Sequence, residues 1–90
     1  MTYLANRMTR AKKSLGQNFL MHARTAERIV LAAKITPEDV VFEIGPGTGM
    51  LTTALLARAR KVIALEADEE LFLQLQEKFA REIAAHKLEL

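Results

Sequence analysis

The fold of this chain is constrained most by a short apolar run that is followed at once by three closely spaced glycines. The run Val40–Ile44 is rich in β-branched residues and almost wholly apolar, which is typical of a strand buried on both faces of a parallel sheet. Gly45, Gly47 and Gly49 then allow the chain to turn sharply and let a ligand approach the backbone. A helix predicted over residues 50–59 directs its free N–H groups at that ligand. The pattern therefore predicts a ligand site beyond the carboxyl end of a parallel strand.

The rest of the chain alternates helices and strands, and this order sets the predicted fold class. Apolar spacing and turn residues predict a helix over 22–34, a turn at 36–39, a strand over 61–66, a helix over 69–85 and the start of a strand at 87–90. Alternation of this kind indicates an α/β fold with a doubly wound parallel sheet, covered on both faces. Residues 1–12 are predicted to form a polar arm.

The spacing of the glycines narrows the class of ligand. A phosphate-binding P-loop has Lys-Ser/Thr after its last glycine, and a dinucleotide fingerprint that starts at Gly45 needs a glycine where Met50 stands. Glu43 lies two residues before the first glycine, and Glu66 ends the next predicted strand. A carboxylate in that place can accept hydrogen bonds from both hydroxyls of a ribose. The pattern favours an adenosyl ligand without a pyrophosphate over the simpler interpretation that the glycines only form a turn.

Composition excludes certain classes of site and of protein. The chain has no cysteine, which rules out disulfides, thiolate-bound metals and thiol catalysis. The two histidines, His22 and His86, are far apart, so we predict no metal site. The longest apolar run, residues 29–33, is too short for a transmembrane helix or a secretory signal peptide, so we predict no membrane contact.

Charge is divided unevenly along the chain. Residues 1–30 carry six basic side chains and one acidic one, whereas residues 31–90 carry seven basic and ten acidic ones. A basic segment on a mildly acidic body favours a polyanionic partner, of which RNA and DNA are the usual examples. Two other interpretations stay open, namely terminal charges that only keep the chain soluble and an Arg-containing mitochondrial presequence over residues 1–10.

Three stretches of the sequence resemble one known family. They are Lys13-Ser14-Leu15-Gly16-Gln17-Asn18-Phe19-Leu20, then Val41-Phe42-Glu43-Ile44-Gly45-Pro46-Gly47-Thr48-Gly49 with Leu51-Thr52, and Val62-Ile63-Ala64-Leu65-Glu66-Ala67-Asp68. On these residues the chain, from about residue 10 to its end, resembles the N-terminal part of the ribosomal RNA adenine dimethyltransferases. It resembles the erythromycin-resistance rRNA methyltransferases less closely. The glycine motif is common to many methyltransferases, whereas residues 16–20 at this distance before it are much more specific.

The resemblance implies a fold, a substrate and a location. The fold is a partial Rossmann-like methyltransferase domain, made of N-terminal helices and the first strands of a parallel sheet, in residues 13–90 after a basic arm in residues 1–12. The implied activity of the parent protein is transfer of methyl groups from S-adenosyl-L-methionine to adjacent adenosines of small-subunit rRNA in the cytoplasm. The implied partner is this rRNA or the immature small ribosomal subunit.

The resemblance also implies which residues bind the cofactor. Asn18 and Leu20 would contact S-adenosyl-L-methionine from the N-terminal segment. Gly45 and Gly47 would line its methionine part through the backbone, and Glu66 would hold the ribose hydroxyls. Asn18 also suits an ordinary cap or turn, and Leu20 an ordinary core position.

Parts of the family's machinery are absent from this sequence. Members of the family are several times longer, and the Asn-x-Pro-aromatic motif that holds their target adenine follows a later strand. We therefore expect a fragment that does not catalyse methyl transfer alone, and we assign no catalytic residue. Two alternatives stay open: a non-catalytic RNA-binding or ribosome-assembly fragment, and a small binder of another adenosyl ligand. In the family the first strand pairs with the fourth, so Val40–Ile44 is expected to be an open edge that favours self-association.

Overall fold

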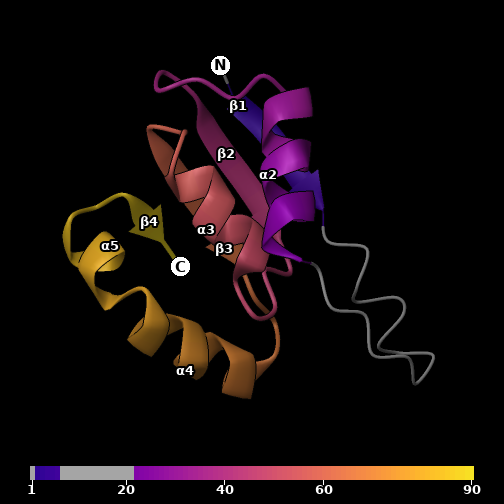
Figure 1. Cartoon of the computed structure of the whole chain (residues 1–90). Helices are drawn as coiled ribbons and strands as arrows, with labels where there is room; N and C mark the ends of the chain where they lie inside the picture. The colour runs from indigo at the N-terminus through magenta and orange to yellow at the C-terminus, as the bar shows by residue number, and fades with distance from the viewer. Residues whose placement is uncertain (1, 7–21) are drawn as a thin grey trace.

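The structure, a computed structural model, describes residues 2–6 and 22–90 and is built around one parallel sheet (Figure 1). In chain order its elements are β1 (Thr2–Asn6), α2 (Ala23–Ala32), β2 (Val40–Ile44), α3 (Met50–Leu56), β3 (Lys61–Leu65), α4 (Glu69–Lys78), α5 (Ala80–Ala84) and β4 (Leu88–Glu89). The predicted α/β class is confirmed, and the strand before the glycines has the predicted bounds. Asn18 and Leu20 lie outside the described residues.

The order of the strands decides where the helices lie. All strands run parallel in the order β1-β2-β3-β4. The connection from β2 to β3 and the connection from β3 to β4 therefore advance across the sheet in the same direction. Because crossovers between parallel strands are right-handed, connections that advance in one direction bring their helices to the same face. Figure 1 shows α2 and α3 lying over one face of β2 and β3.

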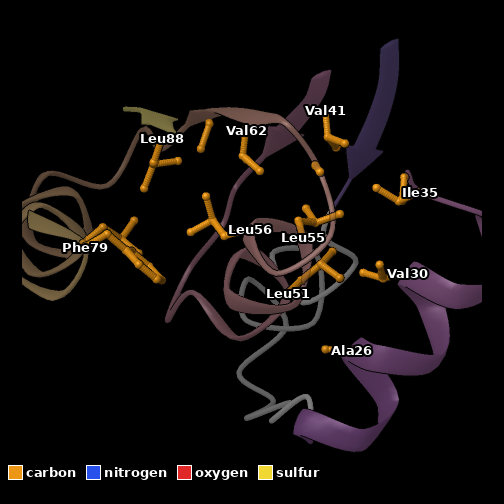
Figure 2. Close-up of a cluster of buried hydrophobic side chains, with 13 residues drawn as sticks. Ala26, Val30, Ile35, Val41, Leu51, Leu55, Leu56, Val62, Phe79 and Leu88 are labelled. Carbon is orange, nitrogen blue, oxygen red and sulfur yellow. The ribbon is translucent and has the colours of Figure 1, made fainter. Parts of the chain in front are cut away.

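The apolar core lies between this face and the helices (Figure 2). Val41 of β2 and Val62 of β3 have no exposed surface. The side chains that share the core with them come from the helices, the loops, β3 and β4: Ala26, Val30, Ile35, Leu51, Leu55, Leu56, Ala59, Ala64, Leu75, Phe79 and Leu88. Burial of one Val or Leu side chain stabilises a fold by about 1.5–3 kcal/mol. The core thus holds α3, which directly follows the glycines, firmly against the sheet.

The opposite face of the sheet is open in the described part of the chain. Phe42 and Ile44 of β2 are 39% and 40% exposed, and Leu65 of β3 is 65% exposed. The predicted burial of Val40–Ile44 on both faces is therefore wrong for these residues. A doubly wound sheet covers both faces because its strand order reverses at one point. The order of the four described strands does not reverse.

The N-terminal residues differ from the predicted polar arm. Thr2–Asn6 form β1, which pairs with β2 so that Leu4 lies opposite Phe42. Thr and Tyr favour strands, but this short signal is obscured in the sequence by the basic residues that follow it. The predicted open edge at Val40–Ile44 is wrong because β1 covers it. The expectation of self-association through that edge loses its basis.

The C-terminal helix predicted over residues 69–85 is two helices. Asp68 caps α4, since its carboxylate accepts a hydrogen bond from the Leu71 N–H at 2.9 Å. The helix ends at Phe79, where φ is −108° and ψ is 28°. The Phe79 side chain is buried and shares the apolar stripe of Leu75, so helical periodicity alone does not reveal the break. The break orients α5 (Figure 1) so that β4 can join the sheet beside β3.

The turn between α2 and β2 depends on Asp39, which is buried. Its carboxylate Oδ2 accepts a hydrogen bond from the Thr36 N–H at 2.8 Å, and its own N–H donates to the Thr36 carbonyl at 3.0 Å. Its carbonyl accepts from the Arg60 N–H at 2.8 Å, which ties the turn to the start of β3. The hydrogen bond from Thr36 holds the pKa of Asp39 below its ordinary value of 3.8, against the opposing effect of burial.

We expect this carboxylate to make the stability of the fold depend on pH. Because the pKa of Asp39 is lower in the folded chain, its contribution is complete well above pH 3.8 and is lost as the pH falls through the folded pKa. Asp39→Asn should therefore lower the urea midpoint of unfolding at pH 7, and its difference from the parent chain should shrink as the pH falls below 3.8. The exposed neighbour variant Glu38→Gln is the control and should change the midpoint little. A gap for Asp39→Asn that persists unchanged at low pH would contradict this account.

Candidate functional site

The glycine loop between β2 and α3 has a backbone that requires its glycines. Gly45, Gly47 and Gly49 have φ values of 70°, 61° and 89°, in the left-handed region that other residues rarely adopt. The loop is tied to β3 by the Gly45 N–H, which donates to the Leu65 carbonyl at 2.8 Å. It closes on itself through the Gly49 N–H, which donates to the Pro46 carbonyl at 2.9 Å. The predicted tight turn at the carboxyl end of a strand is confirmed.

The end of α4 packs against the outer side of this loop. A Cβ atom on Gly49 would lie 2.6 Å from Cε2 of Phe79, so the ring leaves no room for a side chain there. Lys78 Nζ donates to the Thr48 carbonyl at 3.0 Å and lies 5.4 Å from the centroid of the Phe79 ring. The glycine motif in the sequence does not predict that Lys78 and Phe79 contact the loop. These contacts depend on where α4 ends, which the sequence periodicity did not reveal.

Glu66 lies where the sequence predicts it, at the carboxyl end of β3 beside the loop. Its Oε1 accepts a hydrogen bond from the Gly47 N–H at 3.0 Å, and its Oε2 accepts from the Asp68 N–H at 2.9 Å. The carboxylate therefore joins the glycine loop to the start of α4. Each carboxylate oxygen can accept more than one hydrogen bond. The arrangement brings Gly45, Gly47 and Glu66 together.

A cavity of about 280 Å³ opens beside these residues at the carboxyl ends of β2 and β3. It is lined by Ile44, Gly45, Leu65, Glu66 and Ala67. Its walls are mostly apolar, with one carboxylate as the charged group. Mostly apolar walls with a few placed polar groups are typical of small-molecule sites.

The acid of the glycine motif faces the interior. Glu43 of β2 has no exposed surface, and its Oε1 accepts a hydrogen bond of 2.5 Å from Oγ1 of Thr52 in α3. Thr52 is 1% exposed. The pair links the residues on either side of the loop, because Glu43 precedes the first glycine and Thr52 follows the last. Glu43 thus supports the loop from the core side and does not line the cavity.

The described part of the chain holds neither a metal-ligand cluster nor a membrane-spanning helix. Among residues 2–6 and 22–90, no three His, Asp or Glu side chains are grouped so that they could hold a metal ion. The longest helices of this part, α2 and α4, have ten residues each, which is about half of what a bilayer core requires.

The fold and the site together define a class of protein. A parallel sheet with a glycine loop at one strand end, and a carboxylate at the end of the next strand, is the nucleoside-binding arrangement of Rossmann-like folds. Within this class, the family described as ribosomal RNA adenine dimethylase matches residues 8–90. The chain belongs to that family.

Curated relatives and solved structures agree with this assignment. The ribosomal RNA small subunit methyltransferase A of Thermotoga maritima is 52% identical over 79 residues, which are 88% of this chain and 28% of that protein. The protein of the same name from Moorella thermoacetica is 54% identical over 69 residues, 77% of this chain and 24% of that protein. A dimethyladenosine transferase from Plasmodium falciparum superposes with a TM-score of 0.68 at 36% identity, over 80% of this chain and 26% of that one. The 23S rRNA methyltransferase ErmE gives a TM-score of 0.67 at 40% identity, over 80% of this chain and 28% of that one.

The chain is short beside these proteins. It spans about a quarter of the length of the curated relatives that it matches. Their names therefore describe longer proteins, of which this chain matches one part.

We expect the buried pair below the loop to contribute measurably to stability. Thr52→Val keeps the shape of the side chain but removes the hydroxyl that donates to Glu43. Loss of this buried hydrogen bond, which leaves the Glu43 carboxyl group without its Thr52 partner, should cost about 1–3 kcal/mol of unfolding free energy, and urea denaturation measures it. Thr53→Val is the matched control, because Thr53 is the exposed next residue of the same helix and its hydroxyl makes only a partly buried hydrogen bond, to the Gly49 carbonyl at 2.9 Å. It should cost clearly less. Equal losses for the two variants would contradict a special role of the pair.

Proposed function

We propose that this chain is the cofactor-binding N-terminal portion of an rRNA adenine N6,N6-dimethyltransferase. The parent enzyme would transfer methyl groups from S-adenosyl-L-methionine to adjacent adenosines of small-subunit rRNA. Membership of the family and the names of the relatives support this activity. The observation that carries the proposal for this chain is the hydrogen bond between Glu66 and Gly47 at the mouth of the cavity.

The residues around the cavity fit the chemistry of an adenosyl cofactor. Glu66 would accept hydrogen bonds from the ribose hydroxyls, because each carboxylate oxygen can accept more than one hydrogen bond. Gly45 and Gly47 carry no side chain, so the methionine part of the cofactor could approach their backbone closely. Ile44 and Leu65 would supply apolar contacts. When bound, the cofactor supplies an electrophilic methyl group on its sulfonium centre.

Asn18 and Leu20 are proposed as further contacts to the cofactor. Both belong to the segment 16–20, whose likeness to the family is the most specific in the sequence. The match to the family begins at residue 8 and therefore includes this segment.

The role of this chain would be binding and orientation of the cofactor. We assign none of its residues to the acceptance of a proton or to the positioning of the target adenine. Transfer to the adenine amino group requires that group to be held in line with the methyl carbon. The sequence contains no Asn-x-Pro-aromatic motif that would do this.

The proposed partner is small-subunit rRNA or the immature small ribosomal subunit, and the proposed location is the cytoplasm. The names of the relatives support an rRNA substrate. A second candidate function is a non-catalytic RNA-binding or ribosome-assembly role, which the basic segment in residues 1–30 favours. The two functions differ in whether loss of Glu66 matters.

We expect Glu66→Ala to lower the affinity for S-adenosyl-L-methionine by about tenfold or more, because two charge-assisted hydrogen bonds to the ribose are lost. The measurement is an NMR titration in which the amide shifts of Gly45–Gly49 and Glu66 follow the cofactor concentration. Glu70→Ala, in the exposed first turn of α4, is the control and should bind like the parent chain. Affinity for RNA should not fall in either variant. A well-dispersed parent spectrum without shifts at millimolar cofactor would overturn the proposed cofactor role of this chain.

We also expect the chain alone to transfer no methyl groups. Transfer of labelled methyl from S-adenosyl-L-methionine to small-subunit rRNA should equal that of a reaction without protein. The full-length Thermotoga maritima relative, assayed under the same conditions, shows whether the RNA is a competent substrate. Incorporation above background by this chain would show that the target-base motif is dispensable.

A further inference from the structure

The two ends of the sheet carry opposite charge. The carboxyl end, where the cavity opens, gathers the acidic residues Glu66, Asp68, Glu69 and Glu70, with Lys78 as the nearby cation. The strand order places the turns that precede β2, β3 and β4 at the other, amino end (Figure 1). Those turns carry exposed cations that we call the basic edge: Lys34, Arg58, Arg60 and Lys87.

Hydrogen bonds between the turns gather the basic edge into one surface. Arg58 Nε donates to the Ile35 carbonyl at 3.5 Å, which joins the end of α3 to the turn after α2. Lys87 Nζ donates to the Leu56 carbonyl at 3.4 Å, which joins the residue before β4 to the end of α3. These two hydrogen bonds place the positive charges of Arg58 and Lys87 near the carboxyl ends of α2 and α3. There they offset the partial negative charge of the helix dipoles.

That structural role does not account for Lys34 and Arg60. Within the described residues neither side chain makes a hydrogen bond or an ion pair. The acidic side chains at this end are partly occupied, since Asp39 is buried against Thr36 and Glu89 pairs with Lys61 at 3.3 Å. Glu38 is the remaining exposed acid of the α2–β2 turn. Positive charge on the edge therefore faces solvent.

The backbone conformation at Lys34 is a second, independent indication that its side chain has a role. After α2, the Lys34 N–H donates to the Leu31 carbonyl and the Ile35 N–H to the Val30 carbonyl, which is the Schellman ending of a helix. Glycine is the usual residue at the left-handed position of this motif, because it has no Cβ. Lys34 occupies that position with φ 56°. A lysine thus stands where glycine would be less strained.

The ending of α5 repeats the pattern. The His86 N–H donates to the Ile83 carbonyl and the Lys87 N–H to the Glu82 carbonyl, with His86 at φ 61°. The two non-glycine residues with positive φ in the described chain thus both lie at the amino end of the sheet, and both are basic residue types.

We propose that the basic edge contacts the phosphate backbone of the RNA, on the end of the sheet opposite the cofactor cavity. This rests on the proposed function, since it concerns the substrate of the same enzyme. Lysine and arginine neutralise phosphates, and the guanidinium of Arg60 can bind one through two hydrogen bonds. The acidic carboxyl end repels phosphates, so an RNA that presents a base there has to be held by cations elsewhere. Five-residue strands put the two ends about 15 Å apart, so this contact orients the RNA without touching the reacting base.

The test compares two variants with the same loss of charge. Lys34→Gln with Arg60→Gln removes two cations of the basic edge, and Arg28→Gln with Arg81→Gln removes two exposed cations from the middle of α2 and from α5. Binding of a short fluorescein-labelled RNA hairpin is measured by anisotropy across a salt series. We expect the edge variant to lose about threefold to tenfold in affinity at low salt, and its slope of log K against log salt to fall by about 1–2. Equal losses in both variants would show an effect of net charge only and would overturn the proposal.

A single substitution separates binding from stability. Lys34→Gly removes the cation and relieves the left-handed strain, so the urea midpoint should rise while RNA affinity falls. A rise in stability with unchanged RNA affinity would overturn the role of Lys34.

The cofactor titration distinguishes failure of this inference from failure of the proposed function. The edge variant should keep the amide shifts that S-adenosyl-L-methionine produces at Gly45–Gly49. Cofactor shifts without any effect of the edge on RNA binding would remove the inference and leave the function. Loss of RNA binding in the edge variant, with no cofactor shifts in any variant, would keep the edge as an RNA contact and remove the proposed cofactor role.

Discussion

Parallel pairing of β2 with β3 is the constraint on which the rest of the structure depends. It sets Val41 beside Val62 in the core and brings the carboxyl ends of both strands to one edge. The glycine loop leaves one of these ends and Glu66 the other, so residues 19 positions apart meet within 3.0 Å. The same pairing puts the starts of the strands at the opposite edge, where the cations gather. One hydrogen-bonding pattern therefore separates the end of the sheet that carries the cavity from the end that carries the cations.

The glycine loop is held from three directions. Glu66, at the end of the next strand, accepts a hydrogen bond from the loop backbone. The buried pair of Glu43 and Thr52 links the residues before and after the loop on its core side, and Phe79 packs against Gly49 on its outer side. Glycine has more conformational freedom in an unfolded chain than any other residue. These contacts are therefore what keep the three glycines of the loop in their left-handed conformation. A site held in its binding geometry before the ligand arrives spends less binding energy on ordering. Residues that do not line the cavity therefore still help to hold the loop beside it in one conformation.

Most of the helices and strands could be predicted because their signals are local. The β-branched run of β2 and the glycines after it predict a strand and a turn, and both lie where expected. The break at Phe79 could not be predicted, because its apolar side chain continues the stripe of α4 and only the packing against Gly49 distinguishes it. β1 could not be predicted either, since five residues carry a weak strand preference and their partner β2 lies far along the chain. One exposed sheet face was missed for a related reason, because burial on a second face depends on a reversal of strand order that no local pattern records.

The amino-acid sequence by itself determined the α/β class, the strand–glycine–helix unit and the family of this chain. Each of these follows from residue types at short spacings, and a left-handed turn or an apolar period requires little knowledge of distant residues. The tertiary structure decided which face of the sheet is covered, which residues support the loop, and how charge is distributed. Along the sequence, residues 31–90 are simply acidic, whereas in space their charges divide into an acidic carboxyl end and a basic amino end. The physical reason is that parallel strands collect every strand start at one edge and every strand end at the other, whatever their separation along the chain.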